Sequence, residues 1–247
     1  MPDGVKIERP AWYAASPGTW RDWITVLHLP YTSWHLAYVL IGAGLAPVFG
    51  LGRLLGTLLA FALAVGVAAH ALDELRGRPL GTSISSPVLV VVACVSLSGA
   101  AALGVLGMRR VGWGLGILVV LGIIFVVAYN LELWHGRLHN GTVFALAWGA
   151  FPVLTAYYAQ AGTIRLPAVA GAVFAFGTSR AQRVLSTDAR QLRRRVQSVD
   201  GERIDVDGNR QAISRATLIR PLEQALVAMS WSIAALGIAL VLARTGH

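Results

Sequence analysis

Residues 111–139 of the chain read VGWGLGILVVLGIIFVVAYNLELWHGRLH, and this stretch decides the fold class. It contains no charged side chain before Glu132, and an apolar run of this length is typical of a helix that crosses a membrane. If the helix continues to the end of the stretch, Glu132, His135 and His139 are spaced i, i+3 and i+7 and project from one face. Ionisable groups at membrane depth are energetically costly, so their grouping predicts a functional site.

A second stretch, His70-Ala-Leu-Asp-Glu74, closes another apolar run and places its three ionisable side chains on one side of a helix. Asp73, Glu74 and Glu132 are the only acidic residues between positions 24 and 179. Both stretches end on the same predicted side of the membrane, where the first span also begins. We therefore predict one metal-binding cluster, with the ligands His35, His70, Asp73, Glu74, Glu132, His135 and His139.

The composition is that of an integral membrane protein. Of the 247 residues, 55% are hydrophobic and 13% are charged, whereas a soluble domain carries about 25% charged residues. The net charge of +9 does not require a nucleic-acid partner, because most of the basic residues fall on one predicted side of the membrane. The single cysteine, Cys94, lies in an apolar run, which excludes a disulfide framework and a thiol-rich metal site.

The chain has room for one all-α bundle of about seven membrane-spanning helices, each of roughly 20 residues. The predicted spans cover residues 31–49, 54–75, 87–107, 111–134, 141–160, 166–177 and 222–243. Aromatic residues among charges near the N-terminus are typical of a helix that lies at the membrane interface. The expected parts are an interfacial segment (1–30), a six-helix membrane core (31–179), an Arg-rich segment (180–220) and a seventh helix (221–247).

The Arg-rich segment sets the predicted orientation. Ten arginines lie between positions 180 and 220, and all but five of the 21 basic residues fall on the same predicted side. By the positive-inside rule, the N-terminus and this segment are cytoplasmic, and the protein lies in the cell (inner) membrane. Within the segment, residues 196–215 carry two Asp-Gly pairs between alternating apolar residues, which predicts a small cytoplasmic β-hairpin.

Three stretches resemble the UbiA superfamily of intramembrane prenyltransferases. Ala68-Ala-His-Ala-Leu-Asp-Glu-Leu-Arg-Gly-Arg-Pro-Leu80 is similar to the family's first motif, in which Asn-Asp and further Asp residues precede an Arg-Pro-Leu. Tyr129–Leu138 resembles the segment after the fourth span, and Gly149–Gln160 resembles the fifth span of quinone-type members. The chain departs from the family in its smaller number of spans and in its His/carboxylate motifs. The second Asp-rich motif is reduced to Arg180–Asp188.

The resemblance implies a UbiA-like bundle and an enzyme that transfers a prenyl group from a prenyl diphosphate to an acceptor. The lipophilic, isoprenoid substrate would enter from the bilayer, so the expected partners are this substrate and membrane lipids, without nucleic acid. In this interpretation Asp73, Glu74 and Glu132 are the catalytic carboxylates and hold Mg²⁺. Substrate binding is expected at Tyr129, Asn130, Arg180 and Arg183.

Two other functions fit the same residues. A set of imidazoles and carboxylates suits iron, manganese or zinc by ligand type, and Glu132 and His135 have the Glu-x-x-His spacing of di-iron bundles. These features are typical of a non-haem iron oxidoreductase or hydroxylase, here on the same scaffold. The cluster is also compatible with a transporter or binding protein that contains a proton or metal relay.

Each candidate residue also has a structural interpretation. The cluster can be a polar network that ties helix ends together, in which Glu74 pairs with a nearby arginine and His139 caps the next span. Arg180 and Arg183, one turn apart, either clamp a phosphate or carboxylate or extend toward the lipid headgroups. The sequence leaves these alternatives open.

Overall fold

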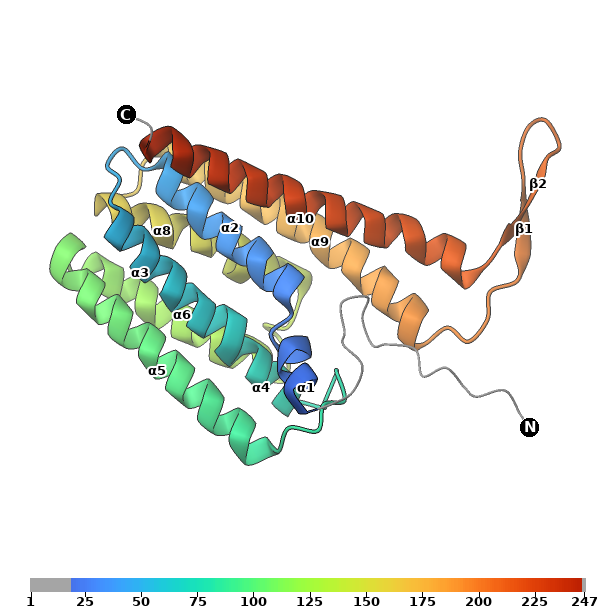
Figure 1. Ribbon diagram of the computed structural model, residues 1–247, viewed down its shortest axis with the longest axis horizontal. Coiled ribbons are helices and arrows are strands. Elements are labelled where there is room, and N and C mark those ends of the chain that lie inside the picture. The colour runs from blue at the N-terminus through green and yellow to red at the C-terminus, as the bar shows by residue number, and fades with distance from the viewer. Residues whose placement is uncertain (1–18, 246–247) are drawn as a thin grey trace.

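The computed structural model describes residues 19–245 and consists mainly of helices (Figure 1). The helices are α1 (Thr19–Val26), α2 (Leu29–Leu45), α3 (Leu51–Phe61), α4 (His70–Leu75), α5 (Ser86–Val111), α6 (Gly114–Asn130), α7 (Gly141–Phe144), α8 (Phe151–Ala161), α9 (Leu166–Arg194) and α10 (Arg215–Thr245). Two π-helical segments, η1 (Ala62–Ala69) and η2 (Ala145–Ala150), join α3 to α4 and α7 to α8. The two strands are β1 (Gly201–Ile204) and β2 (Arg210–Ile213).

Within residues 19–245, four continuous helical stretches are long and apolar enough to cross a membrane. They are Leu51–Leu75, Ser86–Val111, Gly141–Ala161 and Arg215–Thr245. This confirms the prediction of an all-α, membrane-embedded protein with a small hairpin. Four such stretches are fewer than the predicted count of about seven. The choice of membrane and the orientation within it stay predictions.

The other three predicted spans are helices too, but they differ in length or composition. Helices α2 and α6 have 17 residues each and reach about 25 Å, which is at the lower limit for a helix that crosses a hydrocarbon core of about 30 Å. Helix α9 has 29 residues, but its second half is rich in arginine. Of the seven predicted spans, four therefore belong to helical stretches that have both the length and the hydropathy of a membrane-spanning helix.

The helices form a bundle from which one helical pair protrudes. In Figure 1, α10 lies along α2 and α9, and α5 lies at the opposite edge of the bundle beside α3 and α6. Both α9 and α10 extend past the other helices, and the hairpin joins their far ends. Its strands pair antiparallel, with Gly201 opposite Ile213 and Ile204 opposite Arg210. The predicted hairpin within residues 196–215 is therefore confirmed.

Helix α9 continues well beyond the predicted end of its span at residue 177, because its buried stripe continues. The buried small and polar residues recur every three or four positions, at Ala168, Ala172, Ala175, Ser179, Gln182, Ser186 and Ala189. Small side chains allow neighbouring helices to approach closely. The period of this stripe, rather than its hydropathy, extends the helix to Arg194, so much of the predicted Arg-rich segment is helical.

Helix α6 ends at Asn130, so the predicted helix through His139 is wrong. The N–H of Leu133 donates to the carbonyl of Ala128, and the N–H of Glu132 donates to the carbonyl of Tyr129. This pair of bonds is a Schellman motif, which terminates a helix with a left-handed residue. Glu132 has φ 50° and occupies that position. The i, i+3, i+7 argument for Glu132, His135 and His139 therefore fails.

The predicted interfacial segment 1–30 is described from residue 19 onward, and residues 1–18 lie outside the described part of the chain. Helix α1 is fastened to the loop after α4 by one carboxylate. Asp22 accepts hydrogen bonds from the backbone N–H of Ser83 at 2.9 Å and from its hydroxyl at 2.6 Å. The segment therefore joins the bundle through a specific polar contact.

We predict that Gly42→Ala destabilises the bundle, whereas Gly56→Ala does not. A Cβ on Gly42 would overlap the backbone of Val153, where α2 crosses α8, but a Cβ on Gly56 would meet nothing within 4 Å. The expected loss for Gly42→Ala is about 1–3 kcal/mol, and Gly56→Ala is expected to gain about 0.5–1 kcal/mol from helix propensity. Denaturant unfolding in detergent measures both, and equal effects would contradict the close contact.

Candidate functional site

The predicted ligands do not form one cluster, because the rings of His35, His70 and His139 are bonded to three different backbone carbonyls. Nδ1 of His35, which is buried, donates to the carbonyl of Trp148 at 2.9 Å. Nδ1 of His70 donates to the carbonyl of Gly66 at 3.1 Å. A carbonyl oxygen can only accept, so in the neutral ring of His35 Nδ1 carries the proton and only Nε2 is left to accept or to bind a metal.

Both of these carbonyls belong to π-helical segments. In an α-helix the carbonyl of Trp148 would accept from the N–H of residue 152, but Pro152 has no N–H. The N–H of His70 bonds to Val67, not to Gly66. Single-turn π segments are frequent at functional sites, and here each one presents a carbonyl to an imidazole.

His70 is fixed on its other side by a second imidazole. Its ring stacks on that of His28, with centroids 4.4 Å apart, and it also interacts with the carbonyl of Leu27. Burial lowers the pKa of His28 well below its ordinary value of 6.5, and the nearby His70, Arg190 and Arg194 lower it further. His28 is therefore neutral at pH 7, as a stacked pair of imidazoles requires.

Asp73 lies one turn after His70 on α4 and is half-buried. Its carboxylate interacts electrostatically with His139, Arg190 and Arg183. Among the described residues it accepts no hydrogen bond, so both of its oxygens are available to a substrate. Of the predicted catalytic carboxylates, Asp73 is therefore the one without a structural hydrogen bond among the described residues.

His139 and Tyr129 form the neighbouring wall of the site. Their rings stack with centroids 4.5 Å apart, and Nδ1 of His139 donates to the carbonyl of Tyr129 at 3.1 Å. Glu132 lies 4.0 Å from the same imidazole and 3.5 Å from a guanidinium nitrogen of Arg76. The hydroxyl of Tyr129 is buried and has no hydrogen-bond partner, which leaves it free to bond with a ligand.

Two arginines of α9 complete this group of side chains. The guanidinium of Arg183 lies over the ring of Phe144, 5.4 Å from its centroid. Arg190 follows seven residues later on the same helix face, and its Nε donates to the carbonyl of Ser186 at 3.1 Å. Asp73 interacts with both guanidinium groups. We call Asp73, Tyr129, His139, Arg183 and Arg190 the polar cluster.

Other predicted site residues have different positions. Glu74 is fully buried and accepts hydrogen bonds from the N–H of Leu80 and from the N–H and hydroxyl of Thr82, at 2.8 to 3.0 Å. It therefore anchors the loop that follows α4. Asn130 donates to the carbonyl of Val126 at 2.7 Å, within its own helix.

Two more predicted residues lie at the surface. His135 is exposed on a turn with φ 62°, so the helix face that would direct it toward the cluster does not exist. Arg180 is also exposed, and its guanidinium lies against Gly141 at the start of α7. Of the two arginines predicted to bind substrate, only Arg183 belongs to the polar cluster.

The donor set does not fit the predicted metal centre. Within residues 19–245, no group of three or more His, Cys, Asp or Glu side chains is arranged to hold a metal ion. The reason is geometric, because His35, His70 and His139 are each bonded to a different carbonyl, and Glu74 is bonded to its own loop. The predictions of Mg²⁺ or of iron, manganese or zinc stay predictions.

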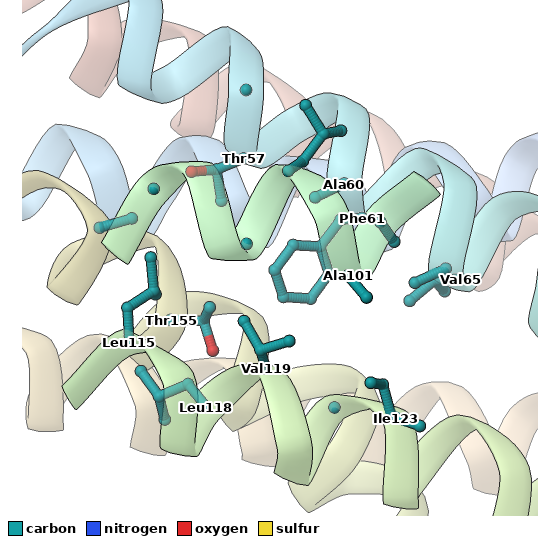
Figure 2. Close-up of a pocket in the computed structure, with 18 of the residues that line it drawn as sticks. Thr57, Ala60, Phe61, Val65, Ala101, Leu115, Leu118, Val119, Ile123 and Thr155 are labelled. Atoms are coloured by element: carbon teal, nitrogen blue, oxygen red, sulfur yellow. The ribbon is translucent and has the colours of Figure 1, made fainter. Parts of the chain in front are cut away.

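A large apolar cavity of about 750 Å³ lies beside the polar cluster, between α3, η1, α5, α6 and α8 (Figure 2). Its walls are mostly Gly, Ala, Leu, Val and Phe side chains. Phe125, Val126 and Trp148 line one end, and Arg53 and Arg110 line the other end. Cavities of this size and character bind small ligands.

Aromatic rings lie between the cavity lining and the polar cluster. Trp148 lines the cavity, and its ring centroid lies 5.2 Å from that of Tyr129. Phe144 lies 6.1 Å from Tyr129, and the guanidinium of Arg183 lies over its ring. Tyr129, Phe144 and Trp148 therefore connect the cavity lining to Arg183, and we call these three rings the aromatic layer.

Sequence reasoning missed Arg190 and Trp148. Arg190 falls beyond the predicted end of its helix, although its spacing of seven from Arg183 was a readable signal. Trp148 precedes Pro152 by four residues, and a carbonyl in that position loses its helical donor. That spacing could have drawn attention to the carbonyl, but not to the side chain.

We predict that Glu74→Ala destabilises the protein far more than Glu132→Ala. Removal of Glu74 leaves buried donors without partners, and the expected loss is about 3 kcal/mol or more. The Glu132–Arg76 pair is largely solvent-exposed, and its loss is expected to cost about 1 kcal/mol or less. Denaturant unfolding in detergent compares the two variants. Similar losses would mean that Glu74 is not a loop anchor.

The comparisons with known proteins add no relative. No protein-family model, no curated protein and no solved structure matches the chain. The likeness to the UbiA superfamily therefore stays a prediction that depends on the residues quoted above. Any function assigned to the chain depends on the polar cluster, the aromatic layer and the cavity.

Proposed function

We propose that the protein is a UbiA-like intramembrane enzyme that acts on a prenyl diphosphate. The isoprenoid chain occupies the apolar cavity, and the diphosphate lies at the polar cluster on the cytoplasmic side. One observation carries this proposal: within the aromatic layer, Trp148 lines the cavity, Phe144 has the guanidinium of Arg183 over its ring, and Tyr129 contacts both rings. An amphiphile with a long apolar chain and an anionic head matches both environments.

The arginines suit the head group. Arg183 and Arg190 are half-buried, and neither forms an ion pair at 4.0 Å or less with a carboxylate of the described residues. Guanidinium groups bind phosphate oxygens through charge-assisted, often paired hydrogen bonds. The unpartnered hydroxyl of Tyr129 adds a neutral donor at the same place.

The proposed prenyl transfer develops negative charge on the diphosphate and positive charge on the allylic carbon, and different side chains stabilise each. Breaking the allylic C–O bond places negative charge on the departing diphosphate, and Arg183 and Arg190 offset that charge. The positive charge on the allylic carbon is stabilised by the faces of Tyr129 and Trp148. A new bond then forms between this carbon and the acceptor, and Asp73 takes the proton that the acceptor releases.

The alternative functions have less support from the structure. A non-haem iron oxidoreductase needs a set of converging ligands, and the described residues do not provide three. A relay for protons or metal ions needs a chain of exchangeable groups, whereas His35 and His70 are each bound to a backbone carbonyl. We therefore propose prenyl-diphosphate chemistry.

Equilibrium binding of a non-hydrolysable geranylgeranyl thiodiphosphate to detergent-solubilised protein tests the proposal. We expect Arg183→Gln and Arg190→Gln each to weaken binding by roughly tenfold or more, because each removes charge-assisted hydrogen bonds. Arg109→Gln is the matched control, since Arg109 is an exposed arginine at the end of α5 and does not belong to the polar cluster. Equal affinity in all three variants would overturn the assignment of the head group.

A second arm of this experiment removes metal. With chelator present, we expect the analogue to bind with little loss, because arginines rather than metal ions neutralise the diphosphate. Binding that requires added Mg²⁺ would instead restore the metal predicted from the family resemblance. Asp73→Asn is expected to retain binding but to lose turnover, which separates its role from that of the arginines.

A further inference from the structure

Among the buried side-chain oxygen and nitrogen atoms of the described lining residues, one has no hydrogen-bond partner. Thr155 lies on α8 and lines the cavity, its residue is only 8% exposed, and its Oγ1 makes no hydrogen bond. Figure 2 shows its hydroxyl oxygen among cavity-lining side chains of α6, including Leu118 and Val119. A buried hydroxyl without a partner has a free-energy cost, so a ligand that supplies one gains affinity.

Other threonines in the bundle behave differently. In helices a threonine hydroxyl commonly bonds to a carbonyl one turn back. Thr57, which lines the same cavity, donates to the carbonyl of Arg53 at 2.8 Å, and Thr178 donates to the carbonyl of Phe174 at 2.9 Å. The hydroxyl of Thr155 makes no such bond, which leaves it available to donate to a ligand in the cavity.

We propose that this cavity is a binding site for a lipophilic molecule with a neutral oxygen function, and that Thr155 donates a hydrogen bond to that oxygen. A neutral carbonyl or hydroxyl fits this environment, because most of the lining side chains are hydrocarbon. The two charged lining residues, Arg53 and Arg110, belong to the start of α3 and the end of α5.

The position of Thr155 specifies where the oxygen must be. On the same helical stretch, Trp148 lines the cavity two turns earlier and Ala159 lines it one turn later. Thr155 therefore lies partway along the cavity rather than at either end. A ligand whose oxygen is flanked by hydrocarbon on both sides matches this placement.

This inference does not depend on the proposed function, and its ligand would compete with an isoprenoid chain for the same cavity. The head group of a prenyl diphosphate would lie beyond the aromatic layer, whereas the neutral oxygen lies within the cavity. The test below uses no diphosphate, so its failure and the failure of the proposed function can be distinguished.

The experiment measures equilibrium binding of tritiated diheptyl ketone and of tritiated pentadecane, the alkane of the same length, to the detergent-solubilised full chain. The wild-type protein is expected to bind the ketone more tightly than the alkane. Thr155→Val, which keeps the shape and removes the hydroxyl, is expected to weaken ketone binding by roughly five- to tenfold and to leave alkane binding unchanged. Thr155→Ser is expected to retain the preference for the ketone.

Thr57→Val is the matched control, because Thr57 lines the same cavity but its hydroxyl already has a partner. It is expected to leave both affinities unchanged. In the absence of ligand, Thr155→Val is also expected to raise the melting temperature, since a methyl group replaces an unpartnered buried hydroxyl. A ligand-binding role predicts this gain in stability together with the loss of affinity.

Three results would overturn the proposal. They are equal binding of ketone and alkane to the wild-type chain, an equal loss of both ligands in Thr155→Val, and no change in ketone binding in that variant. Absence of any binding by either probe would remove the cavity as a binding site altogether.

Discussion

The hydrogen bond from His35 to the carbonyl of Trp148 depends on a proline four residues later. Pro152 cannot supply the helical donor that this carbonyl would otherwise have, and the π-helical segment η2 is where the chain accommodates the defect. The imidazole supplies a donor at 2.9 Å and thereby ties α2 to the stretch that carries Trp148. The position of Trp148, and with it the boundary between the cavity and the polar cluster, depends on that bond.

Two kinds of environment meet at this boundary, and the fold keeps them apart. On the cavity side, small residues and hydrocarbon leave room for an apolar chain. On the other side, the arginines of α9 face a single carboxylate, that of Asp73. A long α9 makes this arrangement possible, because its stripe of small residues packs in the bundle while its later turns carry Arg183 and Arg190. The first half of α9 therefore packs in the bundle, and its second half supplies arginines to the site.

The sequence predicted the fold class, the hairpin and most helix positions, because hydropathy and Asp-Gly turns are local signals. The prediction failed where the same local sequence is compatible with two different backbone structures. The residues after Asn130 suit a continued helix as well as a Schellman end, and only the structure shows Glu132 in the left-handed conformation. Of the candidate site residues, Asp73, Tyr129, His139 and Arg183 do come together. His135 does not, and no sequence pattern revealed that Glu74 accepts three hydrogen bonds from its own loop.

The three acidic residues near the site have different roles, and as a result the arginine side chains outnumber the carboxylates that remain available there. Glu74 is fixed by the loop, and Glu132 is held at the surface by Arg76 and His139. One carboxylate remains to balance two half-buried guanidinium groups. A divalent ion brought to such a place would meet net positive charge and a single carboxylate, whereas Mg²⁺ is usually held by several oxygen ligands and their charge. An anionic head group would instead be attracted by the net positive charge. The balance of charge in the polar cluster therefore favours a phosphate-bearing substrate bound directly by arginine.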